Sequence, residues 1–186
     1  MKNFDPHKVA QYETENWVAY YQKDWFRLLR ASVALVKEAF GLSLPQAIYS
    51  AYLVARAEIA AAPFPDNDIP TAIAYMTRFM ALVKRIHHAG FDPAEAARKD
   101  VNWWVVHRQI FNQRENQPLI DALADSYATT YQVPRERVQD AAWHRAEAMQ
   151  YSDRWVDEGK IPGSPLIPQM QAELDKSYSA LRMVVG

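Results

Sequence analysis

Apolar residues along this chain recur every three or four positions, which is the spacing of one helix face. The stripe in residues 6–40 contains Ala10, Trp17, Val18, Tyr21, Trp25, Leu28, Leu29, Leu35, Val36 and Ala39. The stripe in residues 69–89 contains Ile69, Ala72, Ile73, Met76, Met80 and Val83. No segment alternates with a period of two, and the hairpin dipeptides Asn-Gly and Asp-Gly are absent. The pattern predicts an all-α protein.

Capping residues, prolines and glycines mark where the helices begin and end. An N-cap side chain stands before a proline at residues 5–6, 92–93 and 164–165, and glycines follow helical runs at 41, 90 and 159. These marks divide the chain into segments 6–40, 44–62, 69–89, 93–113, 118–132, 135–158 and 165–184. We therefore expect residues 1–186 to form a single all-helical domain, a bundle of about six to seven helices.

The composition fits a folded, water-soluble protein. Hydrophobic residues make up 49% of the chain and charged residues 23%, so there is enough apolar surface to form a core. The longest apolar stretch, residues 47–64, contains Arg56 and Glu58 and is a poor membrane span. The first residues contain no apolar run, so we expect no signal peptide and a cytoplasmic location.

Several chemistries are absent from the sequence. The chain has no cysteine, which excludes disulfides, thiolate metal ligands and a cysteine nucleophile. It contains no glycine-rich phosphate loop, no Gly-x-Ser-x-Gly, no His-Glu-x-x-His and no Glu-x-x-His. Its formal net charge is -1 with both signs mixed along the chain, so nucleic acid is not an expected partner. No motif is specific enough to identify a family.

Glu58 is the first polar residue that conflicts with an apolar stripe. It falls among the apolar positions of the segment 44–62, where a carboxylate is costly to bury. One interpretation is a carboxyl with a raised pKa that serves as a base or ligand. The other is a structural role, either as an ion pair with an arginine from another helix or simply as a position at the edge of the stripe near the helix end.

The segment 93–113 gives the second group. Asp100, Trp103, Trp104, His107 and Arg108 follow the spacing of one helix face. An acid, a histidine and an arginine among large aromatic rings could line a ligand pocket. Alternatively, the arginine stacks on a tryptophan while the histidine bonds a backbone carbonyl.

The segment 135–158 gives the third group. His144 and Glu147 are three residues apart, so their side chains can meet and supply metal ligands or an oriented base. A solvated charged face is the alternative. Arg145 falls on the apolar side of the same segment and needs a buried carboxylate, for which Glu58 and Asp100 are the candidates.

Two hypotheses for function follow. The first is a small-molecule-binding or scaffolding helical bundle, whose ligand is an apolar or aromatic molecule. The second is an enzyme that uses Glu58, His107, His144 and Glu147, with a non-haem metal as an open option and no cofactor assigned. The enzyme hypothesis requires the first three of these side chains to converge in one pocket. A homodimer is an open expectation, because two-fold dimers are the commonest oligomers and the aromatic content is high.

Overall fold

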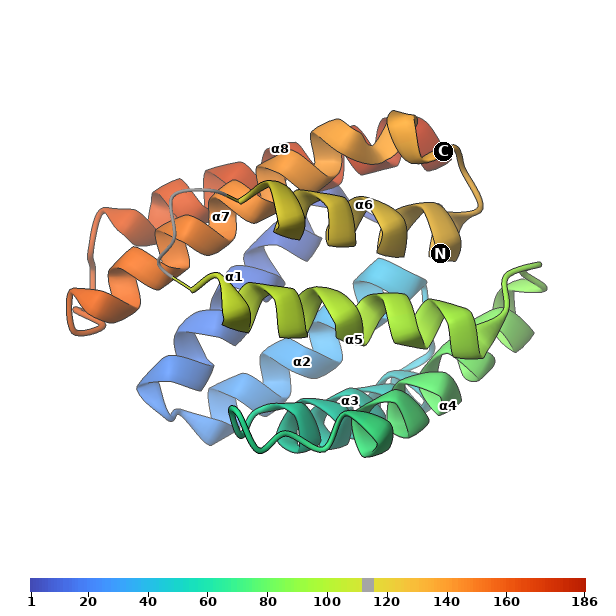
Figure 1. Cartoon of the computed structure of the whole chain (residues 1–186), viewed down its shortest axis with the longest axis horizontal. Helices are drawn as coiled ribbons and strands as arrows, with labels where there is room; N and C mark the ends of the chain where they lie inside the picture. The colour runs from blue at the N-terminus through green and yellow to red at the C-terminus, as the bar shows by residue number, and fades with distance from the viewer. Residues whose placement is uncertain (112–115) are drawn as a thin grey trace.

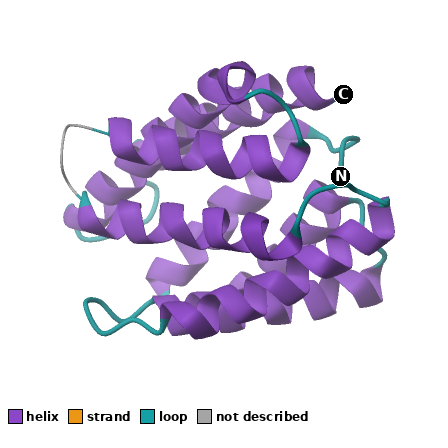
Figure 2. Ribbon diagram, turned by 45° about the vertical axis from the view of Figure 1, so that its right-hand side comes forward, coloured by secondary structure: helices purple, strands orange, loops and turns teal. Residues whose placement is uncertain are grey.

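The computed structural model describes residues 1–111 and 116–186, and within them the predicted all-α fold is confirmed. These residues form eight α-helices and one short 3-10 helix, with no strand among them (Figures 1 and 2). The helices are α1 (Pro6–Gln22), α2 (Trp25–Phe40), α3 (Leu44–Ala61), α4 (Ile69–His87), α5 (Pro93–Gln109), α6 (Gln117–Tyr131), η1 (Arg135–Val138), α7 (Gln139–Asp157) and α8 (Leu166–Val185).

The eight α-helices are arranged in a closed ring. Each α-helix packs against the α-helix that follows it in the chain, and α8 returns to pack against α1. In Figure 1, α3 and α4 run along the lower edge of the molecule, and α7 and α8 run along the upper edge. A ring of this kind surrounds a central space, so side chains from distant parts of the chain can face one another across it.

The expected helix 6–40 is two helices, which raises the helix number above the prediction. Lys23 ends α1 in a left-handed conformation with φ 60°, and its backbone N–H donates to the carbonyl of Ala19. Asp24 then caps α2 by accepting a hydrogen bond from the backbone N–H of Arg27 at 3.1 Å. No glycine marks the left-handed residue at this break, as one normally does. The apolar pattern therefore predicted one continuous helix across it.

Other helix ends also differ from expectation. The segment 93–113 is helical only as far as Gln109, and its last two residues lie outside the described part of the chain. The segment 135–158 begins with the 3-10 helix η1 before α7 starts. Pro168 does not interrupt α8, because it lies in the first turn of this helix, where the backbone N–H needs no partner within the helix.

Two main hydrophobic cores lie on opposite sides of the ring. The larger core joins α1, α6, α7 and α8, and the second joins α3, α4 and α5. A small third cluster, which includes Val36 and Ala51, connects α2 to α3. The cores do not merge into one, which leaves room for a cavity between them. None of the described helices is long and apolar enough to cross a membrane.

Trp155 of α7 is the largest fully buried side chain in the described residues, with 0% of its surface exposed. Its indole N–H donates to the carbonyl of Ile161 at 3.0 Å, and its ring meets Tyr21 edge to face. We expect Trp155→Ala to lower the free energy of unfolding by about 3–5 kcal/mol in urea denaturation, because it removes a large core side chain and leaves a cavity.

Trp143 on the same helix is the matched control, since 45% of its surface is exposed. Trp143→Ala should cost less than about 1 kcal/mol. Equal losses for the two variants would contradict the described packing of α7.

Candidate functional site

A cavity of about 180 Å³ lies inside the ring and is lined by residues from all eight α-helices. Much of its wall is aromatic or apolar, and this part includes Trp17, Phe40, Met76, Phe79, Trp103 and Trp104. Four charged side chains also reach the wall, namely Glu13, Glu58, Asp100 and Arg145. An apolar pocket with a few convergent polar groups is the usual form of a small-molecule site.

Arg145 of α7 anchors the polar side of this cavity. Its guanidinium donates to the carboxylate of Glu13 on α1 at 2.5 Å and to the hydroxyls of Tyr127 at 3.1 Å and Tyr178 at 3.2 Å. The Tyr178 hydroxyl in turn donates to the other Glu13 oxygen at 2.5 Å. Burial opposes the charge of Arg145, but the nearby Glu13 carboxylate holds its pKa well above the usual value.

These contacts correct the expected partners of Arg145. We predicted Glu58 or Asp100, whereas the ion pair is made with Glu13. The guanidinium also lies over the ring of Trp103, 5.0 Å from its centroid. Its Nε is buried without a hydrogen-bond partner in the described part of the chain. Arg145 is therefore a fixed, buried cation whose charge is already neutralised by Glu13.

Asp100 of α5 faces the cavity beside this network. Its Oδ1 accepts hydrogen bonds from the indole N–H of Trp103 and from the hydroxyl of Ser126, both at 3.0 Å. Burial raises the pKa of the Asp100 carboxyl above its ordinary range, and the hydrogen bond from Trp103 is the strongest effect opposing that rise. Asp100 is thus held in place by two neutral donors.

Glu58 of α3 differs from the other acids. It lines the cavity and remains accessible to solvent, but it accepts no hydrogen bond and forms no ion pair with any residue that the structure describes. The side chain is exposed to solvent, but the protein around the carboxyl lowers its hydration, and the negative charges of Asp100 and Glu13 add to this effect. Together they raise the pKa of Glu58 from 4.5 to about 7. The ion pair that sequence reasoning offered for Glu58 does not form with any arginine in residues 1–111 and 116–186.

The two histidines singled out from the sequence lie elsewhere. His107 contacts the carboxylate of Asp153 at 3.1 Å, and His144 contacts that of Glu173 at 2.6 Å. Neither histidine lines the cavity, so Glu58, His107 and His144 do not converge. The condition for the proposed His/carboxylate active site is therefore not met.

The remaining predicted residues divide between the cavity and other places. Trp103 and Trp104 both line the cavity, where their rings meet edge to face with centroids 5.9 Å apart.

Glu147 lies away from the cavity. It accepts a hydrogen bond from Asn116 at 2.8 Å and does not pair with His144. Arg108 donates to the backbone carbonyl of Ala62 at 3.1 Å, just beyond the end of α3. The stacking on a tryptophan that we predicted for Arg108 is made by Arg145 instead.

The described residues contain no group of three or more histidine, aspartate or glutamate side chains placed to hold a metal ion. The candidate ligands contact other acids instead: His107 lies 3.1 Å from Asp153, and the two ring nitrogens of His144 lie 2.6 Å from Glu173 and 3.7 Å from Asp140. The described residues therefore offer no set of ligands for the non-haem metal that the enzyme hypothesis left open.

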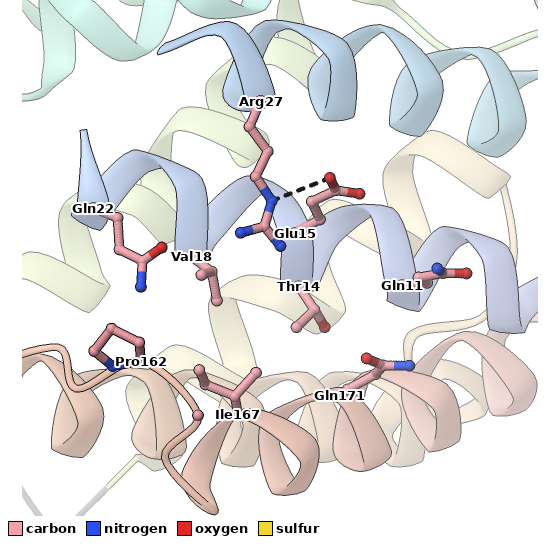
Figure 3. Close-up of a pocket in the computed structure, with 10 residues that line it drawn as sticks. Gln11, Thr14, Glu15, Val18, Gln22, Arg27, Pro162, Ile167 and Gln171 are labelled. Atoms are coloured by element: carbon pink, nitrogen blue, oxygen red, sulfur yellow. Dashed lines mark hydrogen bonds and ion pairs between the residues drawn. The ribbon is translucent and has the colours of Figure 1, made fainter. Parts of the chain in front are cut away.

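A second cavity, of about 360 Å³, lies between α1, the start of α2 and the N-terminal part of α8 (Figure 3). Its charged residues already pair with one another, because Glu15 accepts hydrogen bonds from Arg27 at 3.2 Å and from Arg30 at 2.9 Å. Glutamines 11, 22 and 171 supply much of the remaining polar wall. With its charges satisfied, this cavity is a weaker candidate for a site than the one inside the ring.

Comparison of this chain with protein-family models, with curated protein sequences and with solved structures gives no match. The candidate site therefore rests on its own geometry, which defines an all-α protein with a central cavity that opens to solvent and has a charged, hydrogen-bonded side.

Sequence reasoning missed Glu13, Tyr127 and Tyr178. Glu13 lies three residues after Ala10 and four before Trp17, within the apolar stripe of α1. The criterion that singled out Glu58 would have found it. The two tyrosines gave no comparable signal, because a tyrosine in an apolar stripe is ordinary and its hydroxyl partner lies on another helix.

We expect Arg145→Met to lower the free energy of unfolding by about 3–5 kcal/mol, because it leaves Glu13 buried without its counter-charge. Adding Glu13→Leu should restore most of that loss, since an apolar pair of similar volume avoids the desolvation of both charges. Urea denaturation of both variants measures the effect.

The control for this pair is Arg27→Met, which breaks the more exposed contact with Glu15. It should cost less than about 1 kcal/mol. A double variant no more stable than Arg145→Met would contradict the described pairing.

The raised pKa of Glu58 predicts a pH-dependent stability. Between about pH 4.5 and about pH 7 the folded protein binds more protons at this carboxyl than the unfolded chain, so its contribution to stability is lost as pH rises. Glu58→Gln should therefore stabilise the protein by about 1 kcal/mol at about pH 8 and change little at about pH 5, allowing for solvent screening.

Thermal unfolding at the two pH values measures this difference. Glu95→Gln, at an exposed position on α5, is the control and should have the same small effect at both. A Glu58→Gln effect independent of pH would contradict a raised pKa.

Proposed function

We propose that this protein binds a small, largely apolar molecule inside its ring of helices. The observation that carries the proposal is the cavity between the two main cores, whose wall combines aromatic rings with a few polar groups. Pockets for small molecules generally have this composition. A purely structural bundle would fill such a space with side chains, because protein interiors are close-packed.

The size of the cavity limits the ligand. Protein cavities of about 150 Å³ accept a molecule as large as benzene. The cavity here measures about 180 Å³, so it suits a single ring with a short substituent. The flat rings of Trp17, Trp103 and Trp104 offer suitable stacking or edge contacts for such a ring.

The polar groups supply orientation. Arg145 is fixed by Glu13 and two tyrosine hydroxyls, so the polar side of the cavity is already organised. Glu58 has no partner among the described residues and is free to meet a polar group of the ligand. A ring with one polar substituent would place its ring against the aromatic part of the wall and its substituent at the polar part.

The enzyme hypothesis is not carried forward in its original form. Of its four residues, only Glu58 lines the cavity, while His107, His144 and Glu147 are engaged with other partners. General acid–base catalysis requires the participating groups to lie within reach of one substrate. Ligand binding needs only the cavity and its polar anchor.

The other expectations about partners stay predictions. A homodimer is consistent with large exposed apolar side chains on α2 and α3, such as Trp25, Leu29, Ile48 and Tyr52. The cytoplasmic location and the absence of a nucleic-acid partner likewise rest on composition and charge alone.

Titration with benzyl alcohol, followed by calorimetry or tryptophan fluorescence, tests the proposal. We expect a Kd of about 1 mM or tighter, which is reasonable for a molecule of this size in a preformed cavity. Ala55→Phe places a ring in the cavity from α3 and should weaken binding by at least about tenfold.

Ala74→Phe adds the same ring at an exposed position on α4 and should leave the affinity unchanged. Circular dichroism checks that both variants remain helical. Binding that Ala55→Phe leaves unchanged would overturn the proposal, as would a wild-type protein that binds neither benzyl alcohol nor a charged single-ring analogue of it.

A further inference from the structure

The charges of the central cavity do not balance. Glu13 and Arg145 form a direct ion pair and neutralise each other. Glu58 and Asp100 remain, and among the residues that the structure describes no lysine or second arginine lines the cavity with them. Asp100 is stabilised by two neutral donors, Trp103 and Ser126, whereas Glu58 has no partner among the described residues. The described lining of the cavity thus holds more negative than positive groups, and Glu58, which is exposed to solvent, is the acid without a protein partner.

An excess of carboxylates selects against some ligands. An anion would add to the two acids that lack a counter-charge, Glu58 and Asp100, and is disfavoured by both. A neutral molecule would leave the charge imbalance as it is. A cation would provide the missing counter-charge and would form a charge-assisted hydrogen bond with Glu58.

The aromatic wall also favours a cation. Ring faces attract positive charge, and the effect is strongest for tryptophan. Trp103 already lies beneath the guanidinium of Arg145 at 5.0 Å. Trp17 and Trp104 line the same cavity without a cation of this chain over their rings, among the contacts of the described residues. Both recognition elements for an ammonium group, a free carboxylate and tryptophan rings, are therefore present.

We infer that the ligand is a small ring-bearing amine, bound as a cation with its ammonium group at Glu58 and its ring against the tryptophans. This inference rests on the proposed function and names the class of its ligand. The ring accounts for the apolar wall, and the ammonium accounts for the unpaired acid. The room available, about 180 Å³, fits one ring and a short aminoalkyl group.

The inference implies that binding depends on pH through the groups around Glu58. The titratable or charged groups lining the cavity with it are Glu13 from α1, Asp100 from α5, Tyr127 and Tyr131 from α6, Arg145 from α7 and Tyr178 from α8. The lining residues of α2 and α4 are uncharged. Burial raises the pKa values of the Tyr131 and Tyr178 phenols, which therefore stay neutral. The group that ionises near neutral pH is Glu58, so an ammonium ligand should bind more tightly as pH rises through about 7.

Calorimetric titration with benzylamine, benzyl alcohol and benzoate tests the inference. At about pH 8 the wild-type protein should bind benzylammonium at least about tenfold more tightly than benzyl alcohol, and benzoate most weakly. The preference for the amine over the alcohol should shrink at about pH 6, where Glu58 is largely protonated.

Glu58→Gln should abolish the preference and its pH dependence while benzyl alcohol still binds. Glu95→Gln, which changes an exposed acid on α5, should keep both. Benzyl alcohol or benzoate binding the wild-type protein as tightly as benzylamine would overturn the inference and leave the proposed function intact. Failure of all three probes would overturn the proposed function as well. A preference for the amine that survives in Glu58→Gln would show that Glu58 is not the group that binds the ammonium.

Discussion

The buried ion pair between Glu13 and Arg145 holds the first helix of the chain against its last three. Glu13 lies on α1 and Arg145 on α7, and the pair is completed by hydroxyls from Tyr127 on α6 and Tyr178 on α8. A charge taken out of water is tolerated only with partners in good geometry, so these four helices must adopt one relative placement. That placement brings α8 back to α1 and closes the ring.

Closure of the ring produces the cavity. Because α1, α6, α7 and α8 share one core and α3, α4 and α5 share another, the space between them is filled only in part. The side chains that reach it come from all eight helices, and no pair of neighbouring helices forms the site alone. Polar groups that face this space either find partners across it, as Glu13 does, or remain unpaired, as Glu58 does. The unpaired carboxyl of Glu58 is the polar group of the cavity that is available to a ligand.

The histidines illustrate why adjacency on a helix is a poor guide to a site. His144 and Glu147 are one turn apart on α7, yet His144 turns toward Glu173 on α8 and Glu147 toward Asn116 at the start of α6. A pair three residues apart on an exposed helix gains only a few tenths of a kcal/mol, so a better partner on a packed neighbour replaces it. His107 behaves in the same way with Asp153 of α7.

The sequence by itself determined the local structure of this protein. Helical periodicity and N-caps such as Asp5 and Asp92 were sufficient to predict an all-α chain, since these signals act within a few residues. They also identified Glu58 and Arg145 as polar residues out of place. Only the tertiary structure decided the break at Lys23, where no glycine announces the left-handed residue, and the choice of Glu13 as the partner of Arg145. How the helices pack decides which residues more than a hundred positions apart become partners. The periodicity of a single helix shows which of its faces is buried but does not show which helix covers that face.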